Sequence, residues 1–425
     1  MTRIFAGLVG LILLGVIGFF ALAWHPAIAP APRPDASTFS PTLVAEGAVL
    51  AGAGYCAVCH TAAGGQPYAG GYGLATPFGV IYSANITPDP QTGIGNWSEA
   101  AFARAMHEGV ARDGSLLFPA FPYDHFTKVS DSDIQALYAY LMTLPPVNAP
   151  PRPNTVPFPL NIRYLQAGWQ MLFFHPGEYQ ADATKSAAWN RGAYLATGLS
   201  HCGGCHTPRN ALGAEQAGQE YAGAVIDGWT APALTAADPS PLPWTQADMY
   251  NYLHYGVSAL HGTSAGPMAA VVHTGLAKLP DSDIQAIATY FADTDQSVSR
   301  TNVTLPAASE TGDQLSADDD AHLYASACAS CHYNSTATPA TLRPDLALNT
   351  ALWLPDPTNF IEVVLHGIST QDGIPGVMMP GFADAMSDAD IARLAAYLRR
   401  TQTNLAPWPD LDAKVAAIRE QGDTE

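Results

Sequence analysis

The most regular apolar pattern in the chain occurs in three similar segments. In the first of them Ile134, Leu137, Tyr138 and Leu141 follow the spacing i, i+3, i+4 and i+7. This spacing places the apolar side chains on one face of a helix. A Ser or Asp opens each segment and can cap the helix. We therefore predict amphipathic helices in VSDSDIQALYAYLMTLP, LPDSDIQAIATYFADTD and MSDADIARLAAYLRRTQ.

Two further helices are predicted ahead of each of these segments. The middle ones cover 97–110, 244–257 and 356–369, and each runs from a Ser, Thr or Asp to a glycine, Gly109, Gly256 or Gly367. That asymmetry is typical of helix ends. The first ones are expected in GAVLAGAGYC, GAYLATGLSHC and AHLYASAC. The pattern predicts a mainly α fold of three tandem domains, at residues 45–146, 185–296 and 312–403, each built around its own core.

The first thirty residues differ from the rest of the chain. From Ile4 to Trp24 there is no charged residue, and a helix of this length is long enough to cross about 30 Å of hydrocarbon. Arg3 precedes the run, which favours export of everything after it. Either a retained transmembrane anchor over residues 1–30 or a cleaved signal peptide fits, since AIA at 27–29 resembles a cleavage site. The length of the run and Pro30 favour the anchor.

The charge composition argues against one class of function, nucleic-acid binding. The chain has 425 residues, enough for two to four domains. Asp and Glu number 37 against 18 Lys and Arg, a net charge of −19. Nucleic-acid binding requires a basic face to neutralise phosphates. We therefore expect no nucleic-acid partner.

All six cysteines lie in the pattern C-x-x-C-H, as CAVCH, CGGCH and CASCH. This spacing is that of c-type heme attachment, in which two thiols bind one porphyrin and the following histidine binds its iron. Three copies without a spare cysteine favour heme over disulfides or Cys/His zinc sites, and they exclude cysteine-ligated iron–sulfur clusters in this chain. We predict three hemes c on Cys56, Cys59, Cys202, Cys205, Cys328 and Cys331, with His60, His206 and His332 on the irons.

The three segments resemble class I cytochrome c domains. That resemblance implies a second axial ligand on the loop between the middle and last helices. In the second copy this loop offers Met268. In the third it offers Met378 and Met379, and we choose Met379 because methionine directly before proline is similar to the family's ligand loop. Thioether ligation raises the reduction potential of the iron.

The first copy has no methionine in this loop, which reads FPAFPYDHF. Phe121 stands at almost the offset of Met268 from its motif, but a phenyl ring cannot bind iron. His125 lies in the same loop, and we predict it as the sixth ligand. An open or water-bound iron remains an alternative, as do His107 in the middle helix and Met142 in the last.

Three cytochrome c domains behind one N-terminal anchor resemble the membrane-bound cytochrome subunits of bacterial periplasmic dehydrogenases. The segments AGGYGLATPFGVIYSANITPDPQTGIGNWSE and FPLNIRYLQAGWQMLFFHPGEY are similar to that family. Within it, quinoprotein alcohol, gluconate or sorbitol dehydrogenases form one kind of partner. Molybdenum hydroxylases, such as aldehyde and nicotinate dehydrogenases, form the other, and their loop resembles FPAFPYDHF. We prefer a molybdopterin-type large subunit.

The resemblance implies a route for electrons. They pass from a 2Fe-2S subunit of the partner through the three hemes to ubiquinone, with the heme domains in the periplasm and the anchor in the inner membrane. Two other classes stay open: a multiheme peroxidase, if the first iron has an open site, and a free carrier that docks on a terminal oxidase.

Two segments lie outside the predicted domains. The linker, residues 147–184, contains the apolar and aromatic stretch 161–177. It lies either in the membrane interface or between the first and second domains. Residues 404–425 form a C-terminal tail.

Overall fold

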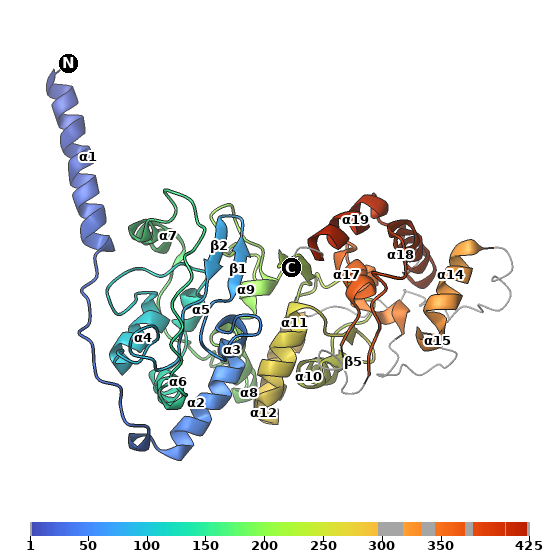
Figure 1. Ribbon diagram of the computed structural model, residues 1–425, viewed down its shortest axis with the longest axis horizontal. Helices are drawn as coiled ribbons and strands as arrows, with labels where there is room; N and C mark the ends of the chain where they lie inside the picture. The colour runs from blue at the N-terminus through green and yellow to red at the C-terminus, as the bar shows by residue number, and fades with distance from the viewer. Residues whose placement is uncertain (1, 296–317, 333–344, 370–376, 404, 423–425) are drawn as a thin grey trace. The chain divides into compact units, whose positions relative to one another are not determined.

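The computed structural model describes residues 2–295, 318–332, 345–369, 377–403 and 405–422 (Figure 1). The predicted domain boundary at residue 296 and that at residue 312 lie outside these ranges. By its contacts the chain forms two compact units. Unit 1 comprises Met1–Ala183, Tyr194–His201 and Ala211–Ala214, and unit 2 comprises Thr184–Ala193, Cys202–Asn210 and Glu215–Glu425. The described part is mainly helical, with three two-stranded antiparallel sheets.

The first repeat contains the three predicted helices and a small hairpin between the first two. Ser98 and Ser130 cap the middle and last helices through their side chains, and Gly109 ends the middle helix at φ 66°. These are the residues that the sequence pattern selected. The elements are α2 (Pro41–Ala53), α3 (Cys56–Cys59), β1 (Gly73–Thr76), β2 (Gly79–Tyr82), α4 (Glu99–Glu108), α5 (Tyr123–Phe126) and α6 (Asp131–Thr143).

The second repeat follows the same order. Its elements are α8 (Ala187–Thr197), α9 (Gly203–His206), β3 (Ala224–Ile226), β4 (Trp229–Ala231), α10 (Gln246–Tyr255), β5 (Val257–Ser258), β6 (Gly262–Thr263), α11 (Pro267–Ala270), η3 (Val271–Gly275), η4 (Leu276–Lys278) and α12 (Asp281–Asp295). Thr245 caps α10, and Gly256 ends it at φ 75°. The predicted helix over 244–257 is confirmed within two residues at each end.

The third repeat preserves the three long helices. Its elements are α14 (Asp319–Ala327), α15 (Ala329–His332), η5 (Leu346–Leu348), α16 (Thr350–Trp353), α17 (Thr358–His366) and α18 (Asp388–Thr403). The start of α17 differs from the expected Asp cap. Pro357 occupies the N-cap position, and the Asp356 carboxylate accepts from the Thr358 backbone N–H at 2.9 Å. Asp356, one residue before the N-cap, therefore binds one of the backbone N–H groups that have no partner within the first turn of the helix.

The first and last helices of a repeat cross at a glycine in the first two copies. In α2, a Cβ on Gly47 would lie 1.9 Å from the Ala136 carbonyl oxygen of α6. In α8, a Cβ on Gly192 would lie 2.0 Å from the Ala286 carbonyl oxygen of α12. No larger residue fits at such a backbone-to-backbone approach. The close crossing fixes the framework that holds the motif directly after the first helix.

The N-terminal run forms a helix, α1 (Thr2–Ala23). Its Phe20 ring lies 5.7 Å from the ring of Tyr164 in the linker. Among the residues that the structure describes, no helix has the length and apolar character needed to cross a membrane. The predicted transmembrane anchor is therefore not supported by the structure.

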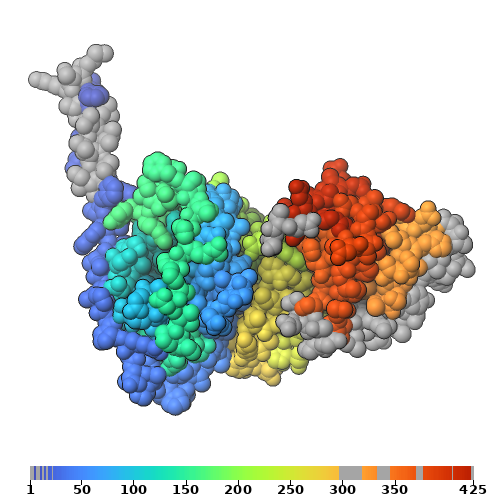
Figure 2. Space-filling model, in the orientation of Figure 1, coloured from blue at the N-terminus to red at the C-terminus, as the bar shows by residue number. Residues whose placement is uncertain are grey.

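The linker lies against the first domain within unit 1 (Figure 2). It contains η2 (Arg163–Leu165) and α7 (Gln166–Phe173). The Arg163 guanidinium lies 4.3 Å from the centroid of the Phe118 ring, and Ala167 is buried with Leu116. The outer side of the same segment carries exposed apolar side chains, at Phe158, Leu160, Ile162, Tyr164, Leu165, Met171 and Leu172. One face of the linker thus packs on protein, while the other presents apolar surface.

The segment predicted as a C-terminal tail contains a helix, α19 (Leu411–Gly422), which packs on α17 and α18. Leu411, Val415 and Ile418 are buried in the core of the third repeat. Arg399 of α18 donates to the carbonyl oxygens of Leu352, Leu354 and Ala406 and lies 4.0 Å from the centroid of the Trp408 ring. The third repeat therefore draws part of its core from residues beyond 403.

We expect Ile418→Ala to destabilise the third repeat. The side chain is 5% exposed, and removal of such a buried aliphatic group costs about 2–5 kcal/mol. Denaturant unfolding of the full chain, followed by fluorescence of its tryptophans, measures the loss. Ala417→Ser, at the exposed neighbouring position, serves as the control and should change the free energy of unfolding by less than about 0.5 kcal/mol. Equal effects of the two substitutions would show that α19 is not part of this core.

Candidate heme-attachment sites

Each C-x-x-C-H motif lies on a single turn of helix, in α3, at the start of α9 and in α15. A turn of helix brings residues three apart to the same face, so the two cysteines of a motif point the same way. All six sulfurs are free of disulfide bonds. Burial raises the pKa of Cys56 to about 12 and that of Cys328 to about 11. The first thiol of these two motifs is therefore shielded from water, whereas Cys59 and Cys331 are exposed.

The histidines of the first two motifs are oriented by backbone carbonyl groups. His60 Nδ1 lies 2.6 Å from the carbonyl oxygen of Ala84, and His206 Nδ1 lies 2.7 Å from that of Pro232. A hydrogen bond from Nδ1–H leaves Nε2 as the unprotonated nitrogen, the arrangement usual for a metal-binding imidazole. Burial also lowers the pKa of both histidines, which favours the neutral ring. These residues fit the iron of a heme c.

The accepting carbonyl is placed by the same local structure in both repeats. Ala84 follows the hairpin β1–β2, and Pro232 follows the hairpin β3–β4. Just before each hairpin the backbone is already bound to the motif, because Gly70 N–H donates to the His60 carbonyl and Gly223 N–H to the His206 carbonyl, both at 2.7 Å. The segment that follows the third motif, residues 333–344, lies outside the described residues. At His332 the backbone carbonyl accepts from the Tyr324 hydroxyl at 3.1 Å.

Gly70 supports a sharp stability prediction. A Cβ on Gly70 would lie 2.5 Å from the carbonyl carbon of Ala84, the residue that orients His60. Gly64 has a similar positive φ but no atom within 4 Å of a built Cβ. Both Gly→Ala variants cost roughly 1–2 kcal/mol for a left-handed alanine, and only Gly70→Ala adds the collision. We expect denaturant unfolding to show a clearly larger loss for Gly70→Ala, and equal losses would contradict this account of the loop.

The two predicted methionine ligands lie on the expected loops. Met268 is half-buried in the short helix α11. Met379 pairs with Ile368 in an isolated antiparallel bridge and packs against the core of the third repeat, whereas Met378 is 63% exposed. Of the two neighbouring methionines, the structure thus turns Met379 inward. Ligation by Met268 and Met379 remains a prediction.

In the first repeat, Phe121 and His125 have different surroundings. Phe121 is half-buried, and its ring packs edge-on against Phe126 with centroids 5.2 Å apart. His125, in α5, is 6% exposed, and its Nδ1 lies 2.8 Å from the Thr197 carbonyl oxygen. This is the same Nδ1-to-carbonyl arrangement as at His60 and His206. Ligation of the first iron by His125 stays a prediction.

The two alternative ligands lie in the helices on either side of the loop. His107 is in α4, and its Nε2 lies 2.8 Å from the Val129 carbonyl oxygen. Met142 is fully buried in α6. Neither lies on the loop between α4 and α6.

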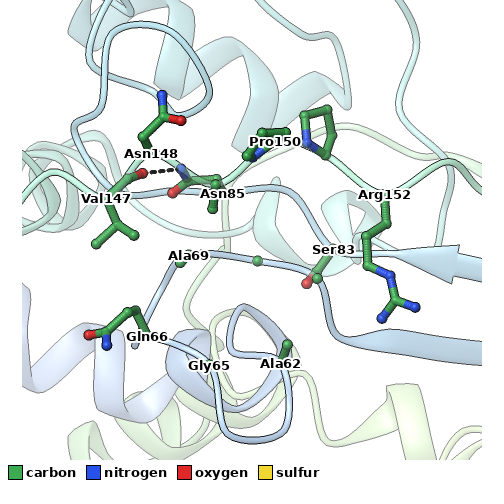
Figure 3. A pocket seen from close by; sticks show the side chains of 14 residues that line it. Ala62, Gly65, Gln66, Ala69, Ser83, Asn85, Val147, Asn148, Pro150 and Arg152 are labelled. Atoms are coloured by element: carbon green, nitrogen blue, oxygen red, sulfur yellow. Dashed lines mark hydrogen bonds between the residues drawn. The ribbon is translucent and has the colours of Figure 1, made fainter.

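A cavity of about 340 Å³ lies beside the first motif (Figure 3). Figure 3 shows Asn85, Val147 and Asn148 on one side of it and Arg152 with Ser83 on another, with a hydrogen bond from the Asn85 amide to the Val147 carbonyl. The lining contains no thiol, imidazole or carboxylate. The cavity therefore has no histidine, cysteine or carboxylate that could act as a general base beside the Ser83 hydroxyl.

The sequence did not indicate two features of these sites. One is the carbonyl that each histidine binds, because any residue supplies a carbonyl. The other is the backbone of Tyr55 and His201, the residues directly before Cys56 and Cys202, which have φ of 42° and 31°. Left-handed backbone is usually indicated by glycine, and here no such signal exists.

Comparison with known proteins gives a consistent set of relatives. The family profile described as Cytochrome c matches residues 44–145 and 318–402. A nicotinate dehydrogenase subunit from Pseudomonas putida is 46% identical over 94% of this chain, which spans 34% of that protein's length. The fructose dehydrogenase cytochrome subunit of Gluconobacter japonicus is 37% identical, over 92% of this chain and 86% of its own length. The gluconate 2-dehydrogenase cytochrome c subunit of Pantoea cypripedii is 36% identical, over 96% of this chain and 94% of its own length.

Proposed function

This chain belongs to the family of cytochrome c subunits associated with dehydrogenases, and from that premise we propose that it carries three hemes c and passes electrons from a periplasmic dehydrogenase to ubiquinone. The observation that carries the proposal is the use of all six cysteines in three C-x-x-C-H motifs, each on a helical turn. Bound heme c supplies reversible one-electron chemistry. The substrate is then oxidised by the partner, and this chain conducts the electrons.

The residues around the first two motifs serve this role by fixing the orientation of the motif histidines. The carbonyl groups of Ala84 and Pro232 keep His60 and His206 in one tautomer. Apolar surroundings disfavour the more highly charged oxidised iron, as burial and axial ligands set heme potentials. Filled axial positions also prevent small molecules from binding the iron, which favours electron transfer over peroxide chemistry.

A molybdenum hydroxylase is the partner that we prefer. The identity to the nicotinate dehydrogenase protein, 46%, exceeds the 36–37% to the fructose and gluconate dehydrogenase subunits. The ligand loop with Phe121 and His125 supports the same choice, because the loop resembles that of the molybdenum-linked group. Such a partner carries a 2Fe-2S subunit that delivers electrons to the hemes.

A second candidate has an observation of its own. This chain spans 86% and 94% of the fructose and gluconate dehydrogenase subunits, but only 34% of the nicotinate dehydrogenase protein. Similarity over nearly the whole length of these two subunits supports a quinone- or flavin-dependent sugar or alcohol dehydrogenase as the partner. Both candidates place this chain between a dehydrogenase and ubiquinone.

Attachment to the inner membrane, with the hemes in the periplasm, is part of the proposal. The exposed apolar side chains of 158–172 support it. High-salt washing of membranes tests it. We expect the chain to remain with the membrane, and release into the wash would contradict the attachment.

Cofactor analysis of the complex purified through this chain distinguishes the candidates. Molybdenum and iron–sulfur iron in a co-purified large subunit support the preferred partner, whereas pyrroloquinoline quinone or flavin supports the second. A chain that purifies without a large subunit from gently solubilised membranes would contradict both and leave a free carrier. Peroxide reduction with a high-spin first heme would point instead to a peroxidase.

A further inference from the structure

Tyr55 and His201 occupy matching positions in the first two repeats, and their side chains meet. Each directly precedes the first cysteine of its motif. The Tyr55 ring centroid lies 4.9 Å from that of His201, at an interplanar angle of 50°. The Tyr55 hydroxyl also donates to the carbonyl oxygen of Ser200. Within unit 1, the residue beside one attachment thiol thus contacts the residue before the next attachment thiol.

Both residues have a backbone conformation that is unfavourable for their side chains. Tyr55 has φ 42° and ψ 36°, and His201 has φ 31°. A left-handed L-residue costs roughly 1–2 kcal/mol, and glycine avoids this cost. Strain of this kind is retained where the surrounding structure or the function requires the side chain. The third repeat has Ala327 at this position, in α14 and without a positive φ.

The contact is enclosed by apolar and aromatic groups. Tyr55 is 8% exposed. The Phe126 ring lies 5.4 Å and the His125 ring 6.2 Å from the His201 ring, centroid to centroid. A Cβ on Gly54 would lie 3.1 Å from the Leu199 side chain, so the two chain segments are in van der Waals contact beside the rings. The Tyr55 ring is thus buried, and the half-buried His201 ring packs among aromatic side chains.

We propose that the Tyr55–His201 contact is the bridge through which electrons pass between the first and second hemes. The bridge carries one electron by tunnelling, so that one ferrous iron is oxidised and one ferric iron is reduced. Neither ring is oxidised, and no bond forms or breaks. The inference rests on the proposed function, because it requires hemes on both motifs. The third heme must exchange electrons by another route, because Ala327, the residue before its first cysteine, has no ring.

Glycine substitution separates a bridging role from a structural one. Tyr55→Gly and His201→Gly remove the rings and relieve the backbone strain, while Tyr55→Phe and His201→Phe keep a ring. The heme content of every variant is counted first. Electron redistribution among the hemes is then followed after pulse radiolysis of the oxidised full-length protein, with Soret circular dichroism reporting the arrangement of the porphyrins. Tyr55→Leu replaces Tyr55→Gly if the latter fails to fold.

We expect the transfer between the first two hemes to slow severalfold in the glycine or leucine variants and to stay near the wild-type rate in the phenylalanine variants, with unchanged Soret dichroism. Glycine variants as fast as wild type would overturn the bridge. So would slow transfer accompanied by altered dichroism in the glycine and phenylalanine variants alike, since the residues would then only position the porphyrins. A wild-type chain with fewer than three hemes would refute the proposed function instead.

Discussion

Replacement of Cys202 and Cys205 by alanine is expected to remove one of three covalent hemes and to unfold the second repeat. A covalently bound heme c would supply part of the apolar surface that this repeat buries, and loss of buried apolar surface lowers the free energy of unfolding. Without thioether bonds, the porphyrin is not retained and His206 loses its iron. Heme-stained denaturing gels and the pyridine hemochrome measure the first effect, and limited proteolysis measures the second.

The matched control lies inside another motif. Ser330 stands between Cys328 and Cys331, with its hydroxyl 3.9 Å from the Cys331 sulfur. Ser330→Ala changes the motif without removing a thiol and should leave all three hemes in place. An unchanged heme count in the double cysteine variant would contradict the assignment of CGGCH.

Replacement of His125 by alanine is expected to convert one heme to the high-spin state. If His125 Nε2 binds the first iron, that heme has two histidine ligands, and loss of one opens the sixth position. His125→Met should restore a low-spin heme with a higher potential, because axial ligand identity moves heme potentials over about 0.8 V. Magnetic circular dichroism in the near infrared distinguishes the ligands, since only methionine-ligated iron gives the weak charge-transfer band.

Two further results distinguish ligation from packing. Phe121→Leu keeps an apolar side chain against Phe126 and should leave the spin state unchanged. If His125 only holds the Thr197 carbonyl, its replacement removes a hydrogen bond worth about 0.5–1.5 kcal/mol and leaves every heme low-spin. A stable, fully low-spin His125→Ala protein would therefore remove His125 from the iron.

The sequence predicted the helices of the repeats because local signals specify them. Ser98, Ser130 and Thr245 cap helices as expected, and Gly109 and Gly256 end them. The helix α19 was missed although Leu411, Val415 and Ile418 follow the spacing i, i+4, i+7. Residues 404–425 follow the last segment of the threefold repeat, and no helix was predicted there.

The candidate sites were predictable only where side chains identify them. The motif cysteines and histidines are recognisable from spacing alone. The hydrogen-bond partners of His60 and His206 are backbone carbonyls 24 and 26 residues away. Every residue has such a carbonyl, so the sequence does not indicate which one accepts. The contact between Tyr55 and His201 joins residues 146 positions apart (201 − 55), and no local pattern pairs them.

The number of covalently bound hemes per chain tests the central claim most directly. Intact-protein mass spectrometry of the purified full-length chain, checked by its pyridine hemochrome, gives this number without any substitution. The three C-x-x-C-H motifs predict a mass increase of three hemes c, with every cysteine used. A chain that carries two or fewer, with unmodified thiols left in one motif, would contradict the account.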